Sequence, residues 1–174
     1  MAERSKSERA STDGGLMLAR GARILILDSP YYAEINGHLL ASAKTVLEEQ
    51  GCTFDRVSVA GALEIPQALA AAVAAGLIGG ADSTYQGAIA LGCVIRGETS
   101  HYDIVCNNAN HWLMETAISK SIPLGNAILT VDTREQALAR ADGGRPSGKG
   151  GDAARACLGL IALKQRFAGT GSAE

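Results

Sequence analysis

The chain has 174 residues, of which 47% are hydrophobic and 20% are charged, and its formal net charge is −2. This length and composition are typical of one soluble globular domain that buries a continuous core. The near-neutral charge and the lack of a long lysine and arginine cluster argue against a nucleic acid or a membrane surface as partner. The longest uncharged run, "IPQALAAAVAAGLIGGA", is too short and too weakly apolar to span a bilayer.

The cysteines and the chain ends indicate the compartment and the limits of the domain. Four cysteines lie far apart, with no CxxC pair and no metal-ligand spacing to a histidine, which favours the reducing cytoplasm and predicts no metal site. Residues 1–20 carry mixed charges without the apolar core of a signal peptide, so we expect a flexible N-terminal arm. One α/β domain is expected over residues 21–168, followed by a disordered tail over residues 169–174.

The first half of the chain alternates short apolar runs with helical patterns. The run "ARILILD" at 22–28 is continuous, as expected for a strand buried on both faces. Residues 31–51 then carry an apolar stripe at helical spacing, and Gly51 ends this helix as a left-handed cap. A second strand is expected at 53–59, and a second helix at 64–76.

The second half repeats the alternation and then ends in two helices. A strand is expected at 85–95, a helix at 101–121 and a strand at 123–131. Thr133 begins a further helix with Gln136 in capping-box spacing. After the glycine-rich break "ADGGRPSGKGG", a last helix is expected from about Asp152 to Phe167.

This order of elements predicts an α/β fold in which four parallel strands, apolar throughout, are covered by helices on both sides. The resulting architecture is a three-layer α/β/α domain. Ligands of such sheets bind beyond the carboxyl ends of the strands, in the loops that enter the helices. Four loops are therefore candidates for the site, at 28–32, 60–66, 96–101 and 130–133.

The loop "RGETSH" combines a helix start with a histidine. Gly97 permits a tight turn, and Thr99 or Ser100 can cap the following helix, with Asp103 in capping-box register to Ser100. Free N–H groups at this helix start form an anion site, for which phosphate is the obvious ligand. The same positive end favours a neutral imidazole at His101, which can move protons. The alternative is that Ser100 and Asp103 only cap the helix and that His101 is solvated, and the residues alone leave both open.

Three further charged residues lie near these loops. Arg140 ends the helix begun by Thr133, Lys149 lies in the flexible stretch "SGKGG", and Glu64 precedes a helix that starts with proline. Taken singly, each is explained more simply by the helix dipole or by solvation. A functional role for them depends on their occurring together.

The segments "GALEIP", "LGCVIRGETSHYDIVCN", "ILTVDTREQALARA" and "GKGGDAARA" resemble, in order, the signature segments of the lumazine synthase family. The resemblance covers residues 22 to about 167. It implies a flavodoxin-like fold and a step of riboflavin biosynthesis. In this step 5-amino-6-ribitylaminouracil and 3,4-dihydroxy-2-butanone 4-phosphate condense to 6,7-dimethyl-8-ribityllumazine, with loss of phosphate and water and without a metal or cofactor.

The resemblance also implies roles for individual residues. His101 transfers protons, and the phosphate is bound by the backbone of Glu98 and Thr99 together with Arg140 and Lys149. The organic part of the substrates is bound by Tyr31, Ala62, Leu63, Glu64, Cys93, Val94, Ile95 and Asn126, the last from across a subunit boundary. Many relatives have Arg-Phe or a similar pair where this chain has Pro30-Tyr31, and Tyr31 is expected to supply the same flat apolar face.

Active sites of this family lie between adjacent subunits of a pentamer, so the resemblance implies a homo-oligomer built on pentamers. The changed Pro30-Tyr31 pair motivates a second hypothesis, a weakly active paralogue that binds flavin or lumazine or serves as a scaffold. A third, another sugar-phosphate enzyme of the same architecture, would lack the "GALEIP" wall.

Overall fold

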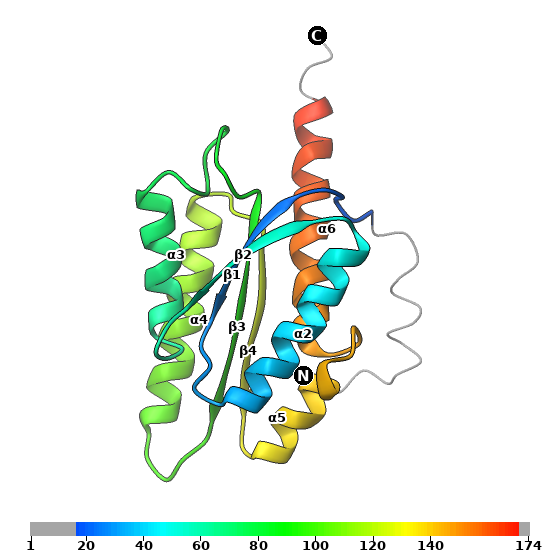
Figure 1. Ribbon diagram of the computed structural model, residues 1–174. Helices are drawn as coiled ribbons and strands as arrows, with labels where there is room; N and C mark the ends of the chain where they lie inside the picture. Colours follow the sequence, from blue (N-terminus) through cyan, green and yellow to red (C-terminus); the bar gives the residue numbers. More distant parts are fainter. Residues whose placement is uncertain (1–16, 171–174) are drawn as a thin grey trace.

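Four parallel strands form the central sheet, in the order β2-β1-β3-β4. They are β1 (Arg23–Asp28), β2 (Thr53–Ser58), β3 (Gly87–Ile95) and β4 (Leu124–Val131). The structure, a computed structural model, describes residues 17–170. The predicted α/β fold with a four-stranded parallel sheet is confirmed, and the carboxyl ends of all four strands meet at one edge, the lower edge in Figure 1.

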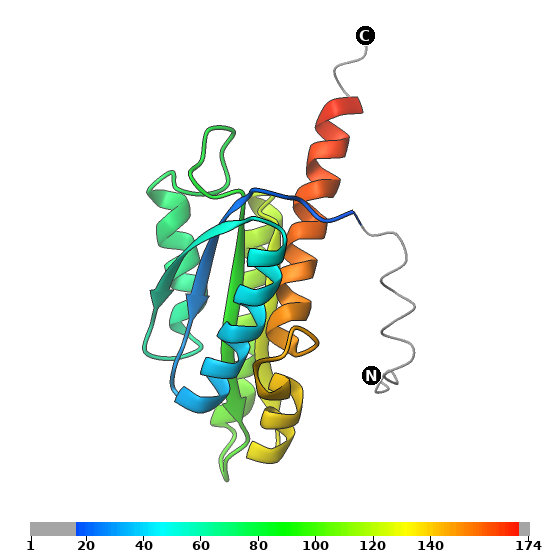
Figure 2. The same cartoon turned by 45° about the vertical axis from the view of Figure 1, so that its right-hand side comes forward.

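Helices cover both faces of this sheet (Figures 1 and 2). One face carries α3 (Glu64–Ala74) and α4 (His101–Ser119), and the other carries α2 (Ala33–Glu49), α5 (Arg134–Ala141) and α6 (Lys149–Thr170). A short 3-10 turn, η1 (Asp142–Gly144), follows α5. None of the helices within residues 17–170 is long and apolar enough to cross a membrane.

The alternation of side chains along the inner strands explains the two layers of helices. Ile24 and Ile26 of β1 pack with the helices α2, α5 and α6, whereas Leu25 and Leu27 pack with α3 and α4. Both faces of β1 and β3 are thus buried, as their continuous apolar runs predicted. The edge strand β2 differs, since most of its residues are exposed or half-buried, and the prediction that every strand is apolar throughout was wrong for it. It pairs with β1 on one side only, so its burial is not needed to close the core.

The last helix begins earlier and ends later than predicted. Residues 149–151 of the stretch "SGKGG" form the first turn of α6, and Ser147 and Gly148 precede it. Gly150 packs against the Leu39 carbonyl of α2 so closely that a Cβ atom would overlap it. At the other end α6 runs to Thr170, so residues 169 and 170 are helical, while residues 171–174 of the predicted tail lie outside the described residues.

Residues 1–16 of the predicted N-terminal arm also lie outside the described residues. Within the described part of that arm, Ala19 is buried and its amide donates to the carbonyl of Leu158 in α6 at 3.2 Å. The domain therefore begins a few residues earlier than position 21.

Candidate active site

A pocket of about 340 Å³ lies at the carboxyl ends of β1 and β3, in the region where ligands of parallel sheets bind. Its walls come from the segments that follow β1 and β2, from the end of β3 and from the first turns of α4. Among the lining residues are the following predicted ones: Tyr31, Ala62, Leu63, Glu64, Cys93, Val94, Ile95, Thr99 and His101. The structure therefore brings together the imidazole, a carboxylate and an apolar wall in one cavity.

Four other predicted site residues do not line this pocket. Glu98 lies on the exposed loop before α4. Asn126 lies on β4, where its amide nitrogen donates to Asn110 Oδ1 at 2.7 Å and its oxygen accepts from the amide of Ile128. Arg140 lies in the last turn of α5 and donates to the carbonyl of Gln136.

The fourth residue, Lys149, starts α6, and its Nζ atom donates to Asp152 Oδ2 at 2.9 Å. Asn126, Arg140 and Lys149 belong to β4 and to the elements after it, while the pocket is built from elements before β4. Within one chain, these three side chains and the pocket are separate.

The helix α4 begins at His101, as predicted, and of the two predicted capping residues, Thr99 and Ser100, only Thr99 accepts a hydrogen bond from an amide of the helix. Ser100 has helical backbone angles (φ −66°, ψ −1°), so its hydroxyl is not placed to accept from the helix amides, and it makes no cap hydrogen bond. The amide of His101 instead donates to Thr99 Oγ1 at 3.4 Å. The carboxylate of Asp103 pairs with Arg96 and does not complete a capping box.

The loop from Gly97 to Ser100 exposes its backbone to solvent. Each of its residues is exposed, and its four amides make no hydrogen bond within the described part of the chain. Unpaired amides at the positive end of a helix are suited to an anion. The geometry is thus compatible with the predicted anion site, although only Gly97 and Thr99 of this loop line the pocket.

The wall formed by Gly61 to Glu64 leads directly into α3. A Cβ atom at Gly61 would lie 2.8 Å from Glu64 Oε2, so the carboxylate of Glu64 folds over the backbone of this glycine. Glu64 also lies in the first turn of α3, where the helix dipole stabilises a negative charge. The absence of a side chain at position 61 therefore fixes where the carboxylate can stand.

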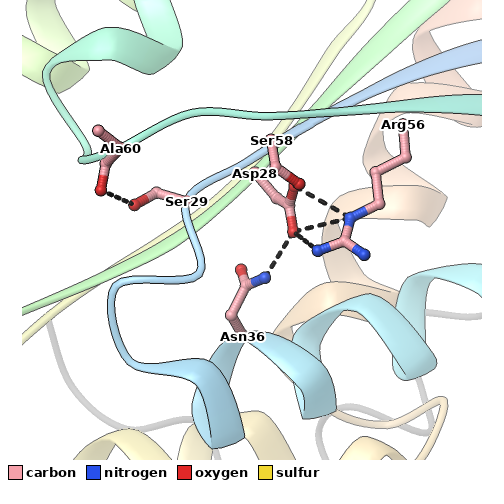
Figure 3. A network of polar contacts seen from close by, with 6 residues as sticks. All are labelled: Asp28, Ser29, Asn36, Arg56, Ser58 and Ala60. Atoms are coloured by element: carbon pink, nitrogen blue, oxygen red, sulfur yellow. Dashed lines mark hydrogen bonds and ion pairs between the residues drawn. The ribbon is translucent and has the colours of Figure 1, made fainter.

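A polar network around the buried carboxylate of Asp28 links the ends of β1 and β2 to α2 (Figure 3). The carboxylate of Asp28, at the end of β1, is fully buried and accepts from Arg56 Nη2 at 2.7 Å, from Ser58 Oγ at 2.7 Å and from Asn36 Nδ2 at 2.5 Å. Burial alone would raise the pKa of Asp28, but the hydrogen bonds from Arg56, Ser58 and Asn36 outweigh it, and the pKa lies below its ordinary value.

The next residue in the chain extends this network to the pocket wall. Ser29 Oγ donates to the carbonyl of Ala60 at 3.3 Å (Figure 3). Since Tyr31 follows Ser29 closely and Gly61 follows Ala60, the network joins two sides of the cavity. The ends of β1 and β2 are thus kept at a fixed spacing.

Sequence reasoning missed several residues of the pocket, namely Tyr32, Gly61, Tyr102 and Val105. The signal for Val105 was present, because it stands one helical turn after His101 and so lies on the same face of α4. Tyr102 was not recognisable from spacing. Its ring contacts the guanidinium of Arg96, which is a tertiary contact.

The thiols of the site are not activated. Burial raises the pKa of Cys93, which lines the pocket, to about 11, and burial also raises the pKa of Cys106. All four cysteines of the chain lie in the described segment as free thiols. Within residues 17–170, no three His, Cys, Asp or Glu side chains are grouped to hold a metal ion.

Comparison with known proteins gives a consistent result. The family model described as 6,7-dimethyl-8-ribityllumazine synthase matches residues 21–165. The 6,7-dimethyl-8-ribityllumazine synthase of Beijerinckia indica is 47% identical over 158 residues, which cover 91% of this chain and 84% of the relative. The synthases of that name from Methylorubrum populi and Azorhizobium caulinodans are 48% and 47% identical over 83% and 84% of this chain, and over 84% and 88% of their own lengths.

Proposed function

The chain belongs to the 6,7-dimethyl-8-ribityllumazine synthase family, and we propose that it condenses 5-amino-6-ribitylaminouracil with 3,4-dihydroxy-2-butanone 4-phosphate to 6,7-dimethyl-8-ribityllumazine. The single observation that carries the proposal is the pocket at the carboxyl ends of β1 and β3. There His101 faces the same cavity as the wall "GALE" and the end of β3.

The reaction makes few demands on the protein. The amine of the pyrimidine forms an imine with the ketone, phosphate is eliminated, and the ring closes. These steps need a group that moves protons and a site that holds both substrates in contact. His101 is the imidazole in the pocket and takes the first role, while Glu64 and the backbone of Ala62 and Leu63 bind the ribityl chain.

We assign the phosphate to the loop before α4. The unpaired amides of Glu98 and Thr99 at the start of the helix support this assignment, as does Gly97, which lines the pocket and has no Cβ to obstruct an anion. Arg140 and Lys149 would add the positive charge. A guanidinium suits this role because its planar fork meets phosphate oxygens in pairs.

The flat face for the pyrimidine is assigned to Tyr31. This side chain lines the pocket, and its ring contacts that of Tyr32 edge-on, with the centroids 5.1 Å apart. Aromatic rings in such a position offer a large apolar surface to a planar ligand. The change to Pro30-Tyr31 therefore leaves a stacking surface in place.

We further propose that the active form is a homo-oligomer built on pentamers, in which Asn126, Arg140 and Lys149 reach the pocket of the neighbouring subunit. Two features support it. These residues lie apart from the pocket of their own chain. An apolar groove between α3 and α4 adjoins the pocket through Leu63, and its Trp112 is 54% exposed, as expected for a surface that another protein covers.

The activity is tested with the purified protein and both substrates, by following the absorbance of the product. Formation of the lumazine at a rate above that of the uncatalysed reaction is expected. If the protein binds lumazine or flavin but forms no product, it is the weakly active paralogue. If it acts on another sugar phosphate and ignores the pyrimidine, the assignment of the "GALEIP" wall is wrong.

The phosphate assignment has its own test. Arg140→Met should raise the KM for the phosphorylated ketone far more than the KM for the pyrimidine, while Arg145→Met, which changes an exposed arginine paired with Asp142, should change neither. Equal effects of Arg140→Met on both substrates would contradict the assignment.

Shared sites are tested by mixing two variants that are each impaired, at a ketone concentration below the KM of Arg140→Met. His101→Ala and Arg140→Met, unfolded together and reassembled, should regain part of the activity, because some sites then combine two intact halves. The molar mass in solution should correspond to five chains of 17.9 kDa or a multiple of five. A monomer with full activity would contradict both statements. We also place the protein in the cytoplasm, because its four cysteines, all within the described residues, form no disulfide and three of them are buried.

A further inference from the structure

The side chain of Arg96, directly after β3, connects three parts of the chain. Its Nε atom donates to Asp132 Oδ1 at 3.0 Å, and its Nη1 atom lies 3.4 Å from Asp103 Oδ1. The guanidinium carbon stands 4.0 Å from the centroid of the Tyr102 ring. One side chain thus joins the end of β3 to the first turn of α4 and to the connection between β4 and α5.

These contacts lie on both sides of the loop whose backbone amides we assign to the phosphate. The backbone amide of Arg96 is bonded to the carbonyl of Val131 at 2.9 Å, which fixes the start of the loop on β4. The residues from Gly97 to Thr99 are exposed and make no backbone bond to the rest of the domain within the described residues, whereas the carbonyl of Ser100 accepts from the amides of Asp103 and Ile104 in α4. The helix turn that follows the loop contacts the same arginine through Tyr102 and Asp103. Arg96 therefore links the two ends of the loop.

Asp132, the partner of Arg96 after β4, is itself held by hydrogen bonds. The amide of Asp132 donates to Gln136 Oε1 at 3.0 Å, and the amide of Gln136 donates to Thr133 Oγ1 at 3.3 Å. Asp132 is thus part of the cap of α5, a short structure with little freedom. A guanidinium that is bonded to this cap has a fixed orientation, and so has the ring that lies under it.

We propose that Arg96 is a positioning residue of the reaction, which holds the loop before α4 so that His101 and Tyr102 face the pocket. The expected effect of Arg96 on the reaction rate rests on the proposed function. The restraint of the loop by Arg96 rests on the structure alone. Arg96 does not line the pocket and does not touch substrate; it acts through Tyr102 and Asp103.

We expect Arg96 to affect the position of the loop and not the stability of the whole domain. The side chains of Arg96, Asp103 and Asp132 are 45%, 56% and 64% exposed, and ion pairs this exposed contribute little to folding. Loss of the arginine should nevertheless free a loop whose ends it joins. In catalysis a displacement of about 1 Å can lower the rate by about 100-fold.

The chain offers a matched control in Arg23. This residue also pairs through Nε and Nη2 with an aspartate, Asp55, is 50% exposed, and its guanidinium carbon lies 5.5 Å from the centroid of the Tyr85 ring. It stands at the start of β1, at the opposite edge of the sheet from the pocket. Arg23→Met and Arg96→Met therefore remove similar interactions at different places.

Two measurements on the wild type and the two variants test the proposal. Amide hydrogen exchange, followed by mass spectrometry, should speed up for the hydrogen-bonded amides of Asp103 and Ile104, which donate to the carbonyl of Ser100, in Arg96→Met and stay unchanged there in Arg23→Met. In steady-state kinetics, Arg96→Met should lower kcat by about 10-fold or more, with a smaller change in the KM for the pyrimidine, whereas Arg23→Met keeps the wild-type kcat. Arg96→Lys should restore part of the rate, because an ammonium can pair with one aspartate but cannot form the planar contacts.

The outcomes separate this inference from the proposed function. Unchanged exchange of the amides of Asp103 and Ile104 in Arg96→Met would overturn the inference whether or not the wild type is active. Faster exchange together with a wild-type kcat would also overturn it, since the loop would then be freed without catalytic effect. A wild type without turnover refutes the proposed function, and exchange still decides whether Arg96 holds the loop.

Discussion

Replacing Arg56 tests whether its ion pair with the buried carboxylate of Asp28 stabilises the domain. In Arg56→Met, the buried carboxylate of Asp28 keeps only Ser58 and Asn36 as donors. Removing one partner of a buried pair destabilises proteins by about 3–5 kcal/mol. Because Arg56 itself is 41% exposed, water can partly replace it, so we expect a loss of about 2–3 kcal/mol, at or below the lower limit of that range. For a domain of this size the loss corresponds to a fall in Tm of about 4–12 °C.

The assay is thermal unfolding at pH 7 and one fixed protein concentration, because assembly would make Tm depend on concentration. The control is Arg23→Met, whose pair with Asp55 is half-exposed and should contribute no more than about 1 kcal/mol. The double variant Arg56→Met/Asp28→Asn should unfold at a higher temperature than Arg56→Met, since the unpaired buried charge is gone. Equal losses for the two arginine variants, or no recovery in the double variant, would refute the reasoning.

Three other properties can be predicted from the same structure. The pKa of Asp28 is lower in the folded chain than in the unfolded one, so its stabilisation is complete above about pH 4 and is lost as the pH falls through the folded value; Tm measured between pH 2 and 6 should fall less steeply in Asp28→Asn than in the wild type. Gly61→Ala should displace the carboxylate of Glu64 and raise the KM for the pyrimidine substrate by about 10-fold, because the new Cβ would stand 2.8 Å from Oε2; an unchanged KM would exclude Glu64 from binding. Iodoacetamide at pH 8 should modify Cys93, with its pKa near 11, at least about 100-fold more slowly in the folded chain than in urea, as measured by peptide mass spectrometry; comparable rates would show that the thiol is ionised.

Local patterns were sufficient to predict the secondary structure. The continuous apolar runs of β1 and β3 indicated strands buried on both faces, and the structure buries both. Thr133 accepts from the amide of Gln136 as its spacing predicted, and Gly51 has the left-handed backbone (φ +66°) that its place after α2 required. In each case the physical cause lies within a few residues of the chain, so the sequence is enough to identify it.

The polar contacts around the pocket were not predictable in this way. Asp28 meets Arg56, and Arg96 meets Asp132, only because the strands are ordered β2-β1-β3-β4 and their carboxyl ends share one edge. Hydrophobic periodicity indicates that strands are parallel but does not give their order. For Ser100 the local pattern led to a wrong prediction. Its spacing to Asp103 favoured a capping box, but its helical backbone angles prevent its side chain from capping α4.

The order of the strands explains why some predicted site residues line the pocket and others do not. The pocket needs the ends of β1 and β3, and both are inner strands with β2 and β4 as neighbours. The strand β4 is an edge strand, so Asn126, on the half-covered face of this strand, is exposed beyond α4 instead of facing the cavity. The helix α5 that carries Arg140 packs with α2 and β4, on the face opposite to α3 and α4. A sequence motif can group these side chains, but it cannot state whether they meet within one chain. In the proposed function they meet the pocket of a second copy, because Asn126 and Arg140 do not line the pocket of their own chain.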